Sequence, residues 1–228
     1  RDYEYQISDA CVDEAIAAMD PAPVAPGKYD IILRNDAMAS ILGAFAGMFS
    51  ADAAQKGLSP LAGREGEDMA AECVTLMDDP LYPINPSPFD DEGTPSVAKA
   101  VIKDGKLETL LHNLKTAKKA GVKSTSNGGR SSAGSPVGVR ITNFYIAPKE
   151  GTLGQLISEL GDGLLITDFS GLHAGVNPVS GKFSVLCKGR LIKDGRDVRA
   201  VNEITLSGDF TELLRSIVRV GGDLRFSM

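Results

Sequence analysis

The sequence contains no tryptophan and few cysteines or histidines, and these shortages already exclude some classes of protein. Cys11, Cys73 and Cys187 are odd in number, widely spaced and without a Cys-x-x-Cys pair. A disulfide framework is therefore not expected, and a reducing compartment is favoured. The only imidazoles, His112 and His173, lie far apart along the chain. These features predict a cytoplasmic protein.

An excess of basic residues and a long apolar run are also missing. The 24 lysines and arginines are outnumbered by 30 aspartates and glutamates, which gives a net charge of −6 and a pI near 5.0. Nucleic-acid binding would require a basic stripe, so we expect no nucleic-acid partner. No apolar run approaches the length of a membrane span and no signal peptide is recognisable, so no membrane partner is expected.

The apolar residues and turn signals predict an α+β fold with largely antiparallel, hairpin-rich sheets and interspersed helices. Asp104-Gly105 and Asp194-Gly195 each separate two apolar runs, as in tight β-hairpins. Asn35 or Asp36 is a candidate N-cap for one long helix, and Ser8, Thr152 and Asp209 are candidate N-caps for others. Strands are predicted within residues 28–33, 72–77, 98–102, 107–111, 141–147, 163–169, 182–192 and 198–206, and helices within 7–19, 36–54, 114–120, 152–160 and 209–218.

Two loops stand out by composition. Asp90-Asp91-Glu92-Gly93-Thr94-Pro95 follows a proline-rich segment, and the prolines exclude a helix interior or a central strand. The residues alone indicate a stiff loop that delivers clustered charge, either as a solvated turn or as part of a site. Residues 124–136 are almost all small and polar, with Arg130 as the only charge, and predict a long mobile loop.

Six segments together resemble one family. They are Lys56-Gly57 with residues 62–67, the acidic loop 90–95, residues 125–130, Asn143-Phe144-Tyr145, residues 175–184, and residues 203–208. In this order the chain resembles the TldD/TldE (PmbA) family, cytoplasmic metallopeptidases formerly described as modulators of DNA gyrase. The resemblance runs from about Lys28 to the end and corresponds to the C-terminal half of a family member. We therefore expect residues 1–27 to be the end of a connecting helix and a linker, and 28–228 to be the C-terminal domain, without the family's N-terminal domain and last residues.

The resemblance also implies a division of labour between two subunits. TldD-like chains carry a His-Glu-x-x-x-His zinc motif, and TldE-like chains lack it. Aligned on Lys56-Gly57, the motif falls on Leu42-Gly43-Ala44-Phe45-Ala46-Gly47, so that Leu42 and Gly47 replace the histidines and Gly43 replaces the glutamate. None of these side chains has a lone pair for Zn²⁺. The resemblance thus implies a TldE-like chain with no catalytic or metal-binding residue, and zinc on a TldD-like partner subunit.

A peptide substrate is implied as well, and a sheet edge can bind an extended peptide through main-chain hydrogen bonds. Candidates for the peptide groove or the subunit contact are Asp90, Asp91, Glu92, Gly93, Thr94, Arg130, Asn177, Ser180 and Phe183, although these residues could equally brace loops. Two alternatives stay open. One is a stand-alone homodimeric module that binds peptides without catalysis. The other is a peptidase with different metal ligands, such as the carboxylates of residues 90–92 with a histidine.

Overall fold

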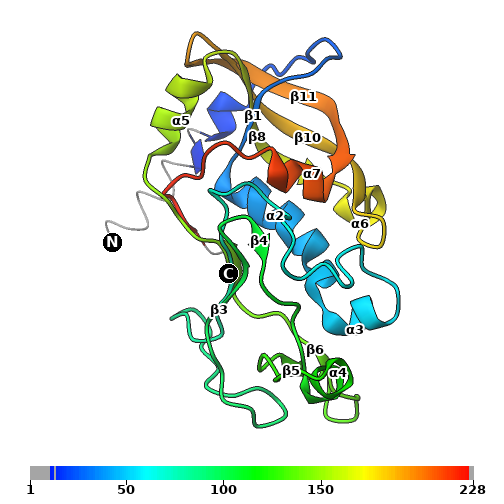
Figure 1. Cartoon of the computed structure of the whole chain (residues 1–228). Coiled ribbons are helices and arrows are strands. Elements are labelled where there is room, and N and C mark those ends of the chain that lie inside the picture. The colour runs from blue at the N-terminus through cyan, green and yellow to red at the C-terminus, as the bar shows by residue number, and fades with distance from the viewer. Residues whose placement is uncertain (1–10, 13, 226–228) are drawn as a thin grey trace.

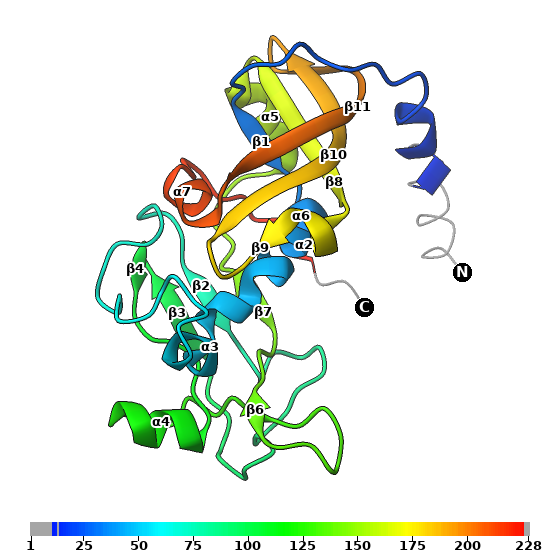
Figure 2. The same ribbon diagram turned by 90° about the vertical axis from the view of Figure 1, so that its right-hand side faces the viewer.

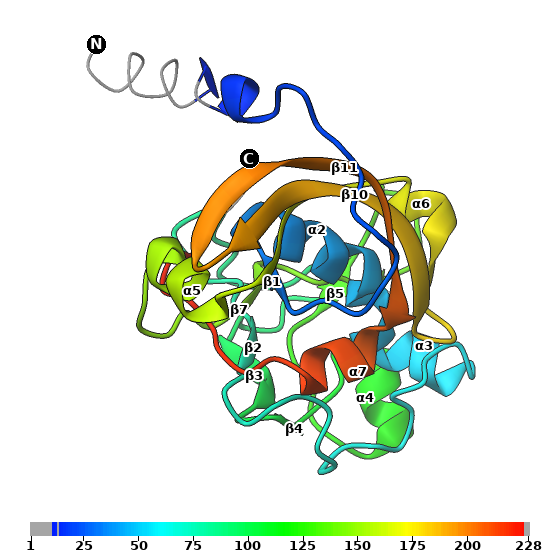
Figure 3. The same ribbon diagram turned by 90° about the horizontal axis from the view of Figure 1, so that it is seen from above.

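The longest strands form one strongly curved sheet (Figures 1 and 3). In the computed structural model, which describes residues 11–12 and 14–225, the strand order is β1-β8-β10-β11. β9 pairs with the first two residues of β10, on the edge opposite to β11. β1 runs parallel to β8, and the other pairs are antiparallel. The bounds are β1 Ile31–Leu33, β8 Gly163–Ser170, β9 Val176–Asn177, β10 Lys182–Lys193 and β11 Arg196–Asp209.

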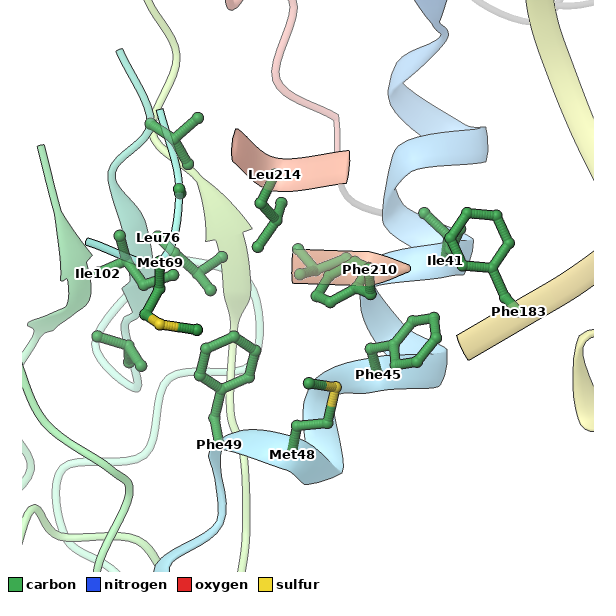
Figure 4. Close-up of a cluster of buried hydrophobic side chains, with 14 of the residues drawn as sticks. Ile41, Phe45, Met48, Phe49, Met69, Leu76, Ile102, Phe183, Phe210 and Leu214 are labelled. Carbon is green, nitrogen blue, oxygen red and sulfur yellow. The ribbon is translucent and has the colours of Figure 1, made fainter. Parts of the chain in front are cut away.

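The inner face of this sheet packs on helix α2 (Asn35–Phe45), as Figures 2 and 3 show. Along β10, Phe183, Val185 and Cys187 are buried, whereas the residues between them are exposed. This alternation is the period of a strand with one face on the core. Phe45 of α2 stacks on Phe210 at 4.4 Å between ring centroids and meets Phe183 edge-on (Figure 4). Shorter helices flank the sheet: α5 (Leu153–Leu160), α6 (Leu172–Gly175) and α7 (Phe210–Arg215).

A smaller antiparallel sheet, in the order β4-β3-β2-β7, lies beyond the end of α2. The apolar core continues into this sheet without a break. Phe49 packs edge-on against Phe144, and the cluster also contains Met69, Leu76 and Ile102 (Figure 4). The remaining elements are β2 Leu76–Asp78, β3 Lys99–Lys103, β4 Lys106–Leu107, β7 Phe144–Ile146, α4 Leu114–Ala120, and the pair β5 Gly128–Gly129 with β6 Gly138–Val139.

The α+β class and both hairpins are confirmed. Asp104 and Gly105 both adopt positive φ (46° and 82°), as do Asp194 and Gly195 (49° and 67°). Two consecutive positive φ angles define the turn that matches the twist of paired strands, and an Asp-Gly sequence favours it. Helix α4 has the predicted bounds, and α5 begins after Thr152 as predicted.

The single helix predicted for residues 36–54 is wrong. The structure has α2, then a 3₁₀ turn η1 (Ala46–Phe49), then a separate helix α3 (Ala51–Gln55). Ser50 is extended (ψ 124°) and its hydroxyl accepts from the Ala53 N–H, so it starts α3. Arg34, not Asn35 or Asp36, holds the N-cap position of α2. The apolar spacing hid the break because Met48 and Phe49 stay buried across it.

Other differences are smaller. The predicted strands 72–77 and 107–111 and the helix 209–218 are shorter in the structure, as β2, β4 and α7. The loop 124–136 is not mobile throughout, because Ser126 and Asn127 are buried and residues 128–129 form β5. Residues 11–12 and 14–17 are helical, whereas the candidate cap Ser8 lies outside the described residues. No helix among residues 11–12 and 14–225 is long and apolar enough to cross a membrane.

The linker after this first helix is tied to the edge of the larger sheet. The Ala22 N–H donates to the Ala200 carbonyl of β11 at 3.3 Å. The Arg199 guanidinium donates to the carbonyls of Ala22 and Pro23, at 2.6 and 3.1 Å. The linker therefore covers the edge of β11 near Ala200.

Candidate functional site

The positions that align with the zinc motif lie on α2 and η1. Leu42 is buried at 3% exposure and belongs to the core. Gly43 and Gly47 are exposed, and a Cβ added at either would meet no atom within 4 Å. The chain changes from α to 3₁₀ winding at Ala46, between the two positions aligned with histidines. Side chains have room at both glycines, but the sequence supplies none.

Elsewhere in the described residues, no group of three or more histidine, cysteine, aspartate or glutamate side chains is close enough to hold a metal ion. The carboxylates of the acidic loop instead accept hydrogen bonds from backbone N–H groups.

Asp90 closes the acidic loop from inside. Its side chain is 3% exposed, and Oδ1 accepts from the N–H groups of Glu92 and Thr94, at 3.0 and 2.8 Å. Its Oδ2 accepts from the Gly128 N–H at 2.8 Å. Gly93 adopts φ 76°, which a glycine accepts without strain. One buried carboxylate thus fixes the turn and joins it to β5.

Asp91 and Glu92 fasten the same loop to two further elements. Asp91 Oδ2 accepts from the Arg130 N–H at 2.7 Å and lies 3.8 Å from the Arg140 guanidinium. Glu92 Oε2 accepts from the Leu114 N–H, at the start of α4, at 2.7 Å. A carboxylate at a helix N-terminus satisfies an unpaired donor and complements the helix dipole. The loop is therefore braced at three points.

Asn177, Ser180 and Phe183 form a second group at the turn between β9 and β10. Asn177 Oδ1 accepts from the N–H groups of Val179 and Ser180, at 3.1 and 3.2 Å. The side chains of Asn177 and Ser180 are exposed, whereas Phe183 is only 6% exposed and packs on Phe45. β9 contacts α2, so this turn lies near the aligned motif.

The candidate residues accordingly form two clusters instead of one. The loop 90–94 meets Gly128 and Arg130 beside α4, in the part of the molecule that carries the smaller sheet (Figure 1). The turn 177–183 adjoins α2 under the larger sheet (Figure 2). Arg130 is exposed, and its guanidinium donates to the Ser135 carbonyl.

The sequence interpretation missed a buried ion pair between β2 and β3, two neighbouring strands of the smaller sheet. Asp78 is fully buried, and its Oδ2 lies 2.9 Å from Lys99 Nζ and accepts from Asn127 Nδ2 at 2.7 Å. Its Oδ1 accepts from the Thr142 N–H and hydroxyl, at 2.8 and 2.7 Å. The missed signal is the strand period, because Asp78 shares the inward face of β2 with Leu76.

His112 is a second buried group with no predicted role. Its side chain is 4% exposed, and Nδ1 has no hydrogen-bond partner among the residues that the structure describes. Burial lowers the pKa of His112 below its usual 6.5, and this outweighs the opposite effects of the Glu65 carboxylate and the Thr116 backbone. The neutral imidazole is therefore the form that the fold accommodates.

This lowered pKa predicts a loss of stability in mild acid. The unfolded chain takes up a proton near pH 6.5, before the folded chain does, so the free energy of unfolding should fall as the pH drops from about 6.5 through the folded pKa. Urea denaturation at several pH values should show this slope in the native protein and a flatter one in His112→Gln. His173→Gln is the matched control, because His173 is exposed. An unchanged slope in His112→Gln would contradict the assignment.

The comparisons with known proteins agree with this architecture. Residues 26–228 match the family model described as the PmbA/TldA metallopeptidase C-terminal domain. A metalloprotease of Archaeoglobus fulgidus is 31% identical over 97% of this chain and 53% of that protein. The α+β domain is thus of a metallopeptidase type. The chain belongs to the PmbA/TldD family.

Two solved structures extend the similarity to the fold. A candidate modulator of a DNA gyrase from Thermotoga maritima is 40% identical with a TM-score of 0.89, over 94% of this chain and 49% of that one. TldE from Thermococcus kodakarensis is 28% identical with a TM-score of 0.88, over 96% of this chain and 50% of that one. The chain spans about half the length of these relatives. The resemblance stated from the six sequence segments is therefore confirmed at the level of the family.

Proposed function

We propose that this chain is the C-terminal domain of a zinc-less, TldE-type subunit of a cytoplasmic metallopeptidase. It pairs with a zinc-bearing homologue of the same family, which supplies the metal and the water-activating carboxylate. The pair degrades or processes small or unfolded peptides.

This proposal rests on the side chains at positions 42, 43 and 47, which align with the zinc motif and offer no metal ligand. A zinc ligand needs a nitrogen, sulfur or oxygen lone pair. Leu42 points an aliphatic side chain into the core, and the two glycines present bare backbone to the surface. An imidazole at position 42 would have to leave or disrupt the apolar cluster to reach a shared ion.

The edge of the larger sheet supports a role in handling peptides. β11 is the edge strand of this sheet. Its outer edge accepts a hydrogen bond from the linker at Ala200. An extended peptide can add to a free strand edge through main-chain hydrogen bonds, largely independently of its side chains. The turn at Asn177 and Ser180 is exposed and next to α2, which makes it a candidate contact for the partner subunit.

The test is the dependence of activity on the partner. The purified protein, mixed with fluorescein-labelled unfolded casein, should release no labelled fragments, whereas addition of a homologue with an intact His-Glu-x-x-x-His motif should start zinc-dependent cleavage. The triple variant Leu42→His, Gly43→Glu, Gly47→His should stay inactive alone, because position 42 faces the core. Cleavage by the unmodified chain without a partner would refute the proposal.

A further inference from the structure

The charge of the chain is distributed unevenly, and α4 carries its most basic part. No aspartate or glutamate occurs from Thr109 to Lys149, and seven of the 24 basic residues lie there. The rest of the sequence therefore has 17 basic residues against all 30 acidic ones. An acidic chain with one basic segment has a surface that attracts what the remainder repels.

The basic residues of α4 and of the turn after it are all exposed. Together with Leu114 and Val122 we call them the α4 lysine face: Lys115, Lys118, Lys119 and Lys123. Residues three and four apart lie on the same side of a helix, and Thr116 and Ala117 hold the opposite side in the core. Leu114 and Val122 are 50% and 52% exposed. The helix stands at the periphery of the molecule, beyond the smaller sheet (Figures 1 and 2).

Within residues 11–12 and 14–225, none of the four ammonium groups forms an ion pair with a carboxylate. Lysines at i and i+4 repel one another and weaken a helix. Lys118 and Lys119 do complement the dipole in the last turn of α4, but Lys115 is in the first turn and Lys123 follows the helix. Helix stability therefore does not explain the set.

We propose that the α4 lysine face docks an acidic segment of another polypeptide, in which aspartates or glutamates alternate with apolar residues. Carboxylates would neutralise the lysines, and apolar side chains would cover Leu114 and Val122. Nucleic acid fits less well, because residues 113–123 contain no arginine and no aromatic side chain for base contacts or stacking.

The test measures binding of the purified protein to fluorescein-labelled poly-L-glutamate by anisotropy at low salt. Binding should weaken as salt is added. The variant Lys115→Gln, Lys118→Gln, Lys119→Gln, Lys123→Gln should lose about tenfold or more in affinity, since each exposed ion pair contributes a factor of about two to five. The matched control, Lys28→Gln, Lys103→Gln, Lys188→Gln, Lys193→Gln, removes the same charge from other exposed lysines and should change affinity by less than about threefold.

Three results would overturn the inference: no binding of poly-L-glutamate at low salt, an equal loss in both variants, or tighter binding through α4 of single-stranded DNA or of phosphatidylglycerol vesicles than of poly-L-glutamate. Circular dichroism and thermal unfolding check that both variants stay folded. The inference does not depend on the pairing with a zinc-bearing homologue, so either proposal can fail while the other holds.

Discussion

Replacement of Asp78 by alanine should lower the free energy of unfolding by about 3–5 kcal/mol, because it removes one partner of a buried ion pair. The carboxylate is fully buried, and Lys99 is only 13% exposed at the side chain. Without Asp78, the ammonium of Lys99, the amide of Asn127 and the two donors of Thr142 each lose a hydrogen bond. Four segments of the chain meet at this carboxylate, so its loss should loosen them together.

Two controls separate burial from charge in the Asp78 experiment. Asp52→Ala breaks the exposed pair with Lys56 on α3 and should cost less than about 1 kcal/mol. The double variant Asp78→Leu, Lys99→Met leaves no unpaired buried charge and should recover part of the loss. Guanidinium denaturation followed by circular dichroism measures all three. Equal costs for Asp78→Ala and Asp52→Ala would show that the buried pair is not what connects these strands.

Replacement of Phe45 by alanine should also cost about 3–5 kcal/mol, because it leaves a cavity where the two parts of the core meet. Phe45 is fully buried, stacks on Phe210 and meets Phe183 edge-on (Figure 4). It is also the last residue of α2, directly before the change to 3₁₀ winding. The same substitution should therefore loosen the helix that carries the positions aligned with the zinc motif.

Phe89→Ala is the matched control for Phe45→Ala, since its ring is 61% exposed and its loss should cost less than about 1 kcal/mol. Thermal unfolding by calorimetry compares the two variants at one pH. A loss below about 1 kcal/mol for Phe45→Ala would mean that the core tolerates the cavity by collapse, against the packing described above.

Local chemistry made much of the fold predictable from the sequence. The two Asp-Gly turns need consecutive positive φ angles, and Asn113 with Gly121 bounds α4 by capping at each end. The parallel pairing of β1 with β8 could not be predicted in the same way, because more than a hundred residues separate Leu33 from Gly163 and neither strand specifies its neighbour. The break between α2 and α3 was not predicted either, because it depends on the extended conformation of one residue, Ser50.

The acidic loop shows why the contacts of site residues are harder to predict from the sequence than turns and helix caps. Composition indicated clustered charge delivered to the surface, but Asp90 is buried and accepts three backbone N–H groups. Asp91 and Glu92 likewise accept from backbone donors of Arg130 and Leu114. These contacts depend on where β5 and α4 lie after folding, which no local pattern encodes. The role of the loop in a groove or a subunit contact stays a prediction.

The zinc content of the purified protein tests the proposed function most directly. A chain with an aliphatic side chain and two glycines at the aligned positions should contain far less than one equivalent of zinc by inductively coupled plasma mass spectrometry, even after incubation with zinc and desalting. A homologue with an intact His-Glu-x-x-x-His motif, treated in parallel, should retain about one equivalent. One firmly bound equivalent on the unmodified chain, lost on substitution of residues in α2 or η1, would contradict the assignment as a zinc-less subunit.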